Sequence, residues 1–248
     1  MQPNGGLAAS ARRAASVFGL FALFAGPALA GDRALIDFIG FSPDARYFAF
    51  EEFGIQDGSG FAYANIYVVD LATDSWLEGT PIRVRADDET KSLAAIRAEA
   101  GTKAHEIISE RDISVPADIA ALIGDGAPDA KGDSLAFGLP GYAPGDVREE
   151  RLVELSTFPA TSPEDCETFF GTAPLGYELR LSGQVETMVL HRDEGDLPRS
   201  RGCPLDYRLH AVVLPWQVDS KAGVIIVSVY PGGFEGPDRR FLAVPFAF

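Results

Sequence analysis

The sequence predicts a mainly β protein of the α+β type, built from antiparallel sheets. Apolar and polar residues alternate over many short runs, a pattern typical of strands with one buried face. Turn-forming glycines and prolines separate these runs. Helical periodicity is confined to one stretch. We therefore expect a β-rich part at 33–86, a short helical insertion near 87–123, and a C-terminal β-sheet or sandwich at 124–248.

The first thirty residues have the three-part pattern of a secretory signal peptide. Arg12 and Arg13 supply positive charge, the apolar run 14–25 follows, and Ala28-Leu29-Ala30 offers small residues to a signal peptidase. The apolar run is shorter than the ~20 residues that a membrane-spanning helix needs. We expect cleavage after Ala30 and no transmembrane anchor afterwards. The remaining 31–248 would be a single β-rich domain in the periplasm or outside the cell.

Four strands are expected in the part that follows the signal peptide. They are Leu35–Phe41, Tyr47–Phe53, Asn65–Asp70 and a short strand starting at Trp76. Ser42-Pro43-Asp44-Ala45 forms the first turn, because proline presets φ at its first central position. A glycine-rich loop, Gly54–Gly60, separates the second strand from the third. The four strands would form a meander.

Two segments of this meander resemble one blade of a TolB-type β-propeller. Phe41–Phe50 reads F-S-P-D-A-R-Y-F-A-F, and Asn65–Leu71 reads N-I-Y-V-V-D-L. The propeller repeat has S-P-D-G-[KR] in the turn and I-[YW]-[VL]-[VM]-[DN]-[LV] in the next strand. Ala45 stands where the repeat has glycine. A propeller needs at least four blades of about 40 residues each, so we expect one blade-like meander and not a complete propeller.

The same stretch, with G-I-Q-D-G-S-G-F-A-Y-A-N between its halves, is similar to an uncharacterised family of predicted secreted bacterial proteins. This resemblance extends over most of the mature chain. It brings no known activity and no site residues.

The insertion is expected to contain three helical segments. They are Thr90–Glu99, Ala104–Arg111 and Val115–Ile123. Asp87 or Asp88 would cap the first of them, because an aspartate side chain accepts hydrogen bonds from the free backbone N–H groups of a first turn.

Six further strands are expected in the C-terminal part. They are Arg151–Leu155, Tyr177–Leu181, Glu186–Leu190, Tyr207–Leu214, Val224–Tyr230 and Phe241–Phe246. Ser182-Gly183-Gln184 indicates a hairpin. Val224–Tyr230 is apolar on both faces, which predicts a central, buried strand. Pro245 places the last strand at a sheet edge, because proline cannot donate a ladder hydrogen bond.

The mature chain has two cysteines, Cys166 and Cys203. An even number of cysteines in an exported protein predicts a disulfide. A redox-active pair would have the two residues close in sequence, as in C-x-x-C, and a structural zinc site needs four ligands. We expect a structural bridge.

Charge and motifs exclude several function classes. The formal net charge of −15 repels phosphate backbones and anionic membranes, so nucleic acid is not an expected partner. His105, His191 and His210 lack the spacing of a helical metal site. Neither G-x-S-x-G nor a nucleotide-binding glycine motif occurs in a usable context. We expect no cofactor and no catalytic residues.

Acidic residues leave two hypotheses open. Glu51 and Glu52 are adjacent on an expected strand and would point to opposite faces, although one could face a pocket. Carboxylates in flexible loops suit Ca²⁺. They are Asp57, Asp125, Asp129 and Asp133. Their spacing matches no EF-hand, so no metal is expected.

The leading functional hypothesis is a non-enzymatic binding or interaction module of the cell envelope. Its partner would be an envelope protein or a small ligand. Its candidate binding loop contains Gln56, Asp57 and Ser59. The alternative is an envelope hydrolase that acts on a sugar or peptide polymer through carboxylates such as Glu51 or Glu52. A purely structural envelope role is the third hypothesis.

Overall fold

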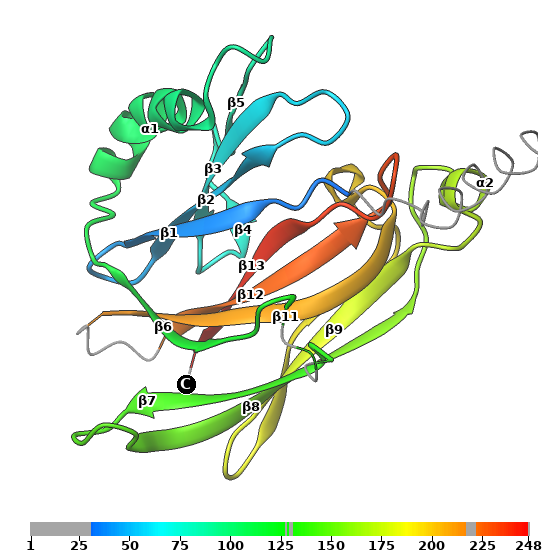
Figure 1. Cartoon of the computed structure of the whole chain (residues 1–248). Coiled ribbons are helices and arrows are strands. Elements are labelled where there is room, and N and C mark those ends of the chain that lie inside the picture. Colours follow the sequence, from blue (N-terminus) through cyan, green and yellow to red (C-terminus); the bar gives the residue numbers. More distant parts are fainter. Residues whose placement is uncertain (1–30, 127, 129–130, 217–221, 248) are drawn as a thin grey trace, which may run out of the picture. The chain divides into compact units, whose positions relative to one another are not determined.

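Figure 1 shows the computed structural model of the chain, which describes residues 31–126, 128, 131–216 and 222–247. The predicted signal peptide and its cleavage point after Ala30 lie outside these residues. Strand content is 52% and helix content 12%, and the strands form three antiparallel sheets, none closed into a barrel. The predicted mainly β class is confirmed. In the described part, no helix is both long and apolar enough to span a membrane.

The first sheet, here called the N-terminal sheet, has the strand order β1-β2-β3-β4, with β5 paired to β3. Its strands are β1 (Leu35–Phe41), β2 (Tyr47–Ile55), β3 (Ala62–Asp70), β4 (Ser75–Trp76) and β5 (Ile82–Arg85). The predicted four-stranded meander is confirmed, and β5 adds a strand that we did not predict. Its likeness to a propeller blade stays a prediction.

The turn between β1 and β2 is stabilised by its own side chains. Ser42 Oγ donates to Asp44 Oδ1 at 2.6 Å and accepts the N–H of Tyr47 at 2.9 Å. Ala45 adopts a positive φ of 53°, a left-handed conformation that glycine adopts without steric cost. The turn thus has a backbone conformation that favours glycine, although this chain has alanine there.

The helical insertion differs from the prediction in two ways. It contains one long helix, α1 (Leu93–Glu110), which runs through Gly101 and is capped by Ser92. Ser92 Oγ accepts the N–H of Ala95 at 3.2 Å. Asp88 is not the cap, because its carboxylate accepts hydrogen bonds from the backbone and hydroxyl of Thr90.

The predicted third helix, Val115–Ile123, is wrong. Its residues form β6 (Ala117–Leu122), which pairs antiparallel with β11 (Pro204–Pro215). Pro116 disfavours the helical conformation for the residue before it. The edge of β11 also offers backbone hydrogen bonds that a short isolated helix cannot replace, so tertiary pairing overrides local propensity.

The second sheet, here called the central sheet, has the order β13-β12-β11-β6. Its other strands are β12 (Ala222–Pro231) and β13 (Arg240–Ala247). Val224 and Ile226 pack with the N-terminal sheet, whereas Ile225 and Val227 pack on the opposite side. Because both faces are covered, β12 is the buried central strand that its apolar run predicted. Pro245 lies on edge strand β13, as expected.

The third sheet, here called the hairpin sheet, has the order β10-β9-β8-β7. Its strands are β7 (Ser134–Pro140), β8 (Val147–Pro159), β9 (Leu175–Ser182) and β10 (Thr187–Arg192). The predicted hairpin joins β9 to β10, with the N–H of Gly183 donating to Glu186 O at 2.9 Å. Tyr177 and Leu179 of β9 pack against the central sheet.

These contacts stack the elements in layers within the part of the chain from Gly31 onward (Figure 1). The central sheet lies between the hairpin sheet and the N-terminal sheet. Helix α1 covers the other face of the N-terminal sheet with Ile96, Ala100 and Ala104.

The predicted disulfide, Cys166–Cys203, is present and buried. Cys166 begins the short helix α2 (Cys166–Phe170), which lies between β8 and β9 and was not predicted. Cys203 lies between the 3₁₀ turn η1 (Arg199–Arg201) and β11. The bridge therefore ties a connection of the hairpin sheet to the start of a central-sheet strand.

We predict that the Cys166→Ser/Cys203→Ser double variant is less stable than the native chain by up to about 4 kcal/mol, because the 37-residue separation closes a long loop in the unfolded state. Urea denaturation of the oxidised chain and the variant measures this difference. Equal midpoints with equal slopes would contradict it.

Candidate ligand-binding site on the N-terminal sheet

The face of β2 that points to the central sheet carries apolar side chains first and then a carboxylate. Phe48 and Phe50 belong to the apolar core between the two sheets. Glu52 follows on the same face, because side chains two residues apart in a strand share a face. Glu51 points to the opposite face, where it meets α1. The two glutamates therefore diverge, as the alternation predicts.

Glu52 is only 1% exposed and binds the edge of the central sheet. Its Oε2 accepts the N–H of Phe241 at 3.0 Å, and its Oε1 accepts from Asn65 Nδ2 at 3.2 Å. Burial raises the pKa of Glu52, although the charge of Arg240 and these hydrogen bonds act in the other direction. The carboxylate thus serves as a hydrogen-bond partner for β13, whose outer edge has no neighbouring strand in its sheet.

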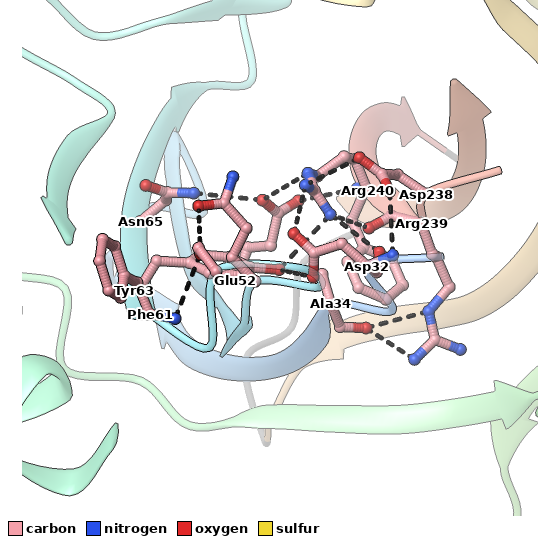
Figure 2. A network of polar contacts seen from close by, with 12 residues as sticks. Asp32, Ala34, Glu52, Phe61, Tyr63, Asn65, Asp238, Arg239 and Arg240 are labelled. Atoms are coloured by element: carbon pink, nitrogen blue, oxygen red, sulfur yellow. Dashed lines mark hydrogen bonds and ion pairs between the residues drawn. The ribbon is translucent and has the colours of Figure 1, made fainter. Parts of the chain in front are cut away.

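Arg240 of β13 links the segment before β1 to this edge (Figure 2). Its Nη2 lies 2.7 Å from Asp32 Oδ2 and 3.3 Å from Asp238 Oδ2. Tyr63 Oη donates to Asp32 Oδ1 at 3.0 Å, and Arg240 lies over the Tyr63 ring. Burial raises the pKa of Tyr63 above its usual range, so its hydroxyl stays protonated and donates. The result is an ion-paired floor.

An open pocket of about 340 Å³ lies above this floor. Its lining residues come from β3, β5, β13 and the neighbouring loops. They are Asp32, Gln56, Tyr63, Asn65, Arg83, Val84, Arg85 and Arg240. The pocket therefore combines three guanidinium groups with amide and hydroxyl groups, which are hydrogen-bonding partners for a polar ligand.

Arg83 and Arg85 supply the surplus positive charge of the pocket. On β5 they pair across the strand with Asn65 and Tyr63 of β3, so both side chains share the pocket face. Both arginines are exposed. Within the described part of the chain, neither forms an ion pair or a side-chain hydrogen bond, whereas Arg240 is fully engaged by acidic groups.

The absence of a side chain at Gly54 leaves space for the Tyr63 ring. Gly54 pairs with Tyr63 across β2 and β3, and a Cβ atom at Gly54 would lie only 2.9 Å from Tyr63 Oη. A larger residue would push the ring out of its position. The glycine is therefore needed for close packing under the pocket.

The predicted binding loop lies at the rim of this pocket. Gln56 lines it directly. Ser59 Oγ donates to Gln56 Oε1 at 3.1 Å and accepts the N–H of Phe61, which holds the loop in shape. Asp57 is exposed at the loop tip, and its charge contributes to the raised pKa of Asp238, after burial and the charge of Asp32. A binding role for the loop stays a prediction.

Sequence reasoning did not single out Asp32, Arg83, Arg85 or Arg240. The run Ile82-Arg83-Val84-Arg85 carried a usable signal, because its alternation places both arginines on one strand face. Asp32 and Arg240 are 208 residues apart in sequence. No local pattern could have paired them.

Glu51 is held by α1. Arg97 donates to Glu51 Oε2 from Nε at 3.0 Å and from Nη2 at 2.6 Å, and it also contacts Asp37. The Arg97 guanidinium lies 3.7 Å from the centroid of the Phe53 ring. Glu51 is therefore a structural partner of the helix.

Asp125, one of the carboxylates considered for calcium, is already occupied. It accepts from Tyr230 Oη at 2.6 Å and from Arg239 Nη1 at 2.7 Å, and Arg33 lies 3.2 Å away. Asp129 lies outside the described residues. The residues that the structure describes contain no group of three or more His, Cys, Asp or Glu side chains arranged to hold a metal ion.

The three histidines lie in different environments. His105 is exposed on α1, and His191 of β10 lies 3.1 Å from Asp193. His210 of β11 packs on the Phe241 ring, with centroids 5.0 Å apart, and its buried Nδ1 has no hydrogen-bond partner among the described residues. Burial lowers the pKa of His210, and the charge of Arg239 lowers it further.

Fold and pocket together define a mainly β protein with an open, arginine-lined pocket beside a buried ion-pair network. Residues 49–246 match the family described as predicted secreted protein (DUF2259), so the chain belongs to this family. The predicted resemblance to an uncharacterised family of secreted proteins is thereby confirmed. Searches of the curated proteins and of the solved structures found no match.

We predict that Arg240→Met lowers the free energy of unfolding by about 3–5 kcal/mol, because it leaves buried carboxylates without their counter-ion. Lys103→Ala is the control: it breaks an exposed pair with Glu99 and should cost under about 0.5 kcal/mol. Urea denaturation measures both. A loss in Arg240→Met no larger than in the control would refute the role assigned to this network.

We predict that His210 makes the chain less stable as the pH falls below about 6.5, the pKa of a free histidine. The folded-state pKa lies lower, so the unfolded chain takes up the proton first, and the stability present above that pH is lost on acidification. Unfolding of native, His210→Gln and His105→Gln chains between pH 7 and 5 tests this. His210→Gln should show the shallower loss, by at most about 1.4 kcal/mol per pH unit, and His105→Gln should behave like the native chain. Equal slopes for all three would contradict it.

Proposed function

We propose that this chain is a non-enzymatic binding module that holds a small anionic ligand in the pocket on the N-terminal sheet. One observation carries the proposal: Arg83 and Arg85 lie side by side on the pocket wall and, among the described residues, have no acidic partner. Arginine binds carboxylate and phosphate groups through two parallel N–H···O bonds. Two such groups on one face can hold one or two anionic groups of a ligand.

The ion-paired floor favours this use of the pocket. Asp32, Asp238 and Glu52 share the single cation Arg240. Burial raises the pKa of Glu52 and of Asp238, which favours their uncharged forms at the base. Arg83 and Arg85 are the exposed charged groups on the pocket wall. The net charge of −15 acts mainly at longer range, and salt at physiological strength screens exposed charges beyond about 8 Å. An anion at the pocket would therefore feel the two arginines more than the remote acids.

The hydrolase hypothesis has weaker support. A general acid or base must reach its substrate, but the Oε atoms of Glu52 are directed to Asn65 and Phe241 in a buried site. Glu51 binds Arg97. Burial raises the pKa of Glu52, but among the described residues the acidic residue that lines the neighbouring pocket is Asp32, which is ion-paired with Arg240.

We also propose that the chain acts in the periplasm or outside the cell. The family description supports export, and the disulfide is typical of an oxidising environment such as the periplasm or the cell exterior. Cleavage after Ala30 by a signal peptidase would release the binding module into that compartment.

Calorimetric titration of the exported chain with small anions tests the proposal, using citrate, succinate, galacturonate and glucose 6-phosphate as probes. Neutral glucose serves as the ligand control. We expect saturable binding of at least one anion, weakened about tenfold or more by Arg83→Gln/Arg85→Gln, because each charge-assisted hydrogen bond contributes about 1.5–3 kcal/mol.

The matched control is Arg199→Gln, which removes an exposed arginine that does not line this pocket. It should bind the anion as the native chain does. Loss of affinity in Arg199→Gln to the same degree would indicate a general charge effect. If none of the anions binds, the proposed anionic ligand is wrong. The alternative is then a protein partner that binds the Gly54–Gly60 loop.

A further inference from the structure

A second pocket, of about 260 Å³, opens where all three sheets meet. Its walls come from β3 and β4 of the N-terminal sheet, β9 and β10 of the hairpin sheet, and β13 of the central sheet. Its lining includes polar and aromatic residues that can contact a ligand. They are Asp74, Trp76, Tyr177, His191, Ser200 and Arg201. It does not overlap the arginine-lined pocket, because the two share no residue.

The back of this pocket is a packed and fully paired polar cluster. Arg201, whose side chain is 10% exposed, donates to Tyr207 Oη at 3.1 Å and lies 3.4 Å from Asp193. Asp193 also lies 3.1 Å from His191 Nε2. Burial alone would raise the pKa of Asp193, but the hydrogen bond of His191 and the charge of Arg201 outweigh it and lower the pKa. Arg201 is thus neutralised by an ionised carboxylate.

The aromatic wall is equally well supported. The Tyr177 ring stacks on the His191 ring, with centroids 4.6 Å apart, and the Arg201 guanidinium lies over the Tyr177 ring, 5.2 Å from its centroid. Trp76 packs its ring edge-on against Tyr67, with centroids 5.3 Å apart, yet remains 42% exposed. A large aromatic surface therefore stays available beside the pocket.

On the lining of the same pocket, Asp74 and Ser200 offer unused polar groups. Within the described ranges, the side chains of both lack hydrogen-bond and ion-pair partners. Asp74 stands in the turn before β4 with a positive φ of 47°, a conformation that aspartate tolerates better than most residues. The pocket wall partly desolvates its carboxyl, and the resulting rise in pKa is only partly offset by His191 and Arg201.

We propose that this pocket binds a single neutral sugar ring. The C–H face of a sugar ring packs on an aromatic side chain such as Trp76, and its hydroxyls donate to a carboxylate such as Asp74 and exchange hydrogen bonds with Ser200. The pocket is slightly smaller than the ~300–1,000 Å³ of drug-sized ligand sites, which suits one ring rather than a polymer segment.

The charges around the pocket argue against an anionic ligand. An anion would meet Asp74 and Asp193, whose charges exceed that of Arg201. A cation would be attracted by Asp74, because Arg201 is already paired with Asp193, so a cation is the alternative that the test must separate. A neutral ligand with several hydroxyl groups needs hydrogen bonds but no charge compensation.

The test uses Trp76 itself as the reporter. The chain has two tryptophans, Trp76 and Trp216, so Trp216→Phe leaves Trp76 as the only source of indole fluorescence. Glucose, galactose, mannose and N-acetylglucosamine are the probes at millimolar concentrations. Tetramethylammonium and succinate represent cations and anions. Saturation-transfer NMR on the native chain detects weak binding independently.

We expect at least one sugar to change the fluorescence of Trp216→Phe saturably and to receive saturation from the native protein. Asp74→Asn in the Trp216→Phe background should weaken binding about tenfold or more, because it removes a charged acceptor. Trp76→Phe should show no fluorescence response. Arg83→Gln/Arg85→Gln should retain sugar binding, so failure of the anion site would not mimic failure here.

Three results would overturn the proposal. One is the absence of saturation transfer to every sugar from a chain with native circular dichroism. Another is a sugar response that Asp74→Asn leaves unchanged. The third is a response to tetramethylammonium or succinate in place of the sugars, which would assign the pocket to an ionic ligand.

Discussion

Burial of both faces of the central sheet is the constraint on which the rest of this structure depends. Ile225 and Val227 of β12 face the hairpin sheet, and Val224 and Ile226 face the N-terminal sheet. A strand apolar on both faces cannot remain at a surface without a large hydrophobic cost. Two further sheets must therefore cover it, and α1 in turn covers the outer face of the N-terminal sheet.

The edge of β13 carries buried polar contacts between the central sheet and the N-terminal sheet. An edge strand exposes unpaired N–H and C=O groups that can pair with other chains. Here a buried glutamate, Glu52, accepts the N–H of Phe241, and Arg240 joins the same edge to the segment before β1. Buried ion pairs are costly to form and costlier to break. They link two sheets whose named strands, among the described residues, do not pair with each other and whose backbones meet at the isolated bridges Arg33–Arg239 and Phe41–Val115.

Strand β13 also connects the two pockets. Arg240, at its beginning, contributes to the arginine-lined pocket, and Leu242–Val244, further along, line the pocket at the junction of three sheets. Both pockets have an internally paired polar base, and each has further polar groups without ion-pair partners among the described residues. Such pre-organisation lowers the entropic cost of ligand binding. The two proposed ligands differ because one rim carries unpaired arginines and the other carries an aromatic ring and a free carboxylate.

What the sequence alone determined was local. Alternation and turn residues predicted most strands, the two-sided apolar run predicted the buried strand, and the pair Cys166–Cys203 followed from their even number in an exported chain. Only the tertiary structure decided that Val115–Ile123 pairs as a strand, because the edge of β11 is not visible in that segment. It alone brought Asp32 to Arg240, and Trp76 to His191 and Arg201. These residues are distant in sequence, so their contacts depend on how the sheets stack, and no local periodicity encodes that stacking.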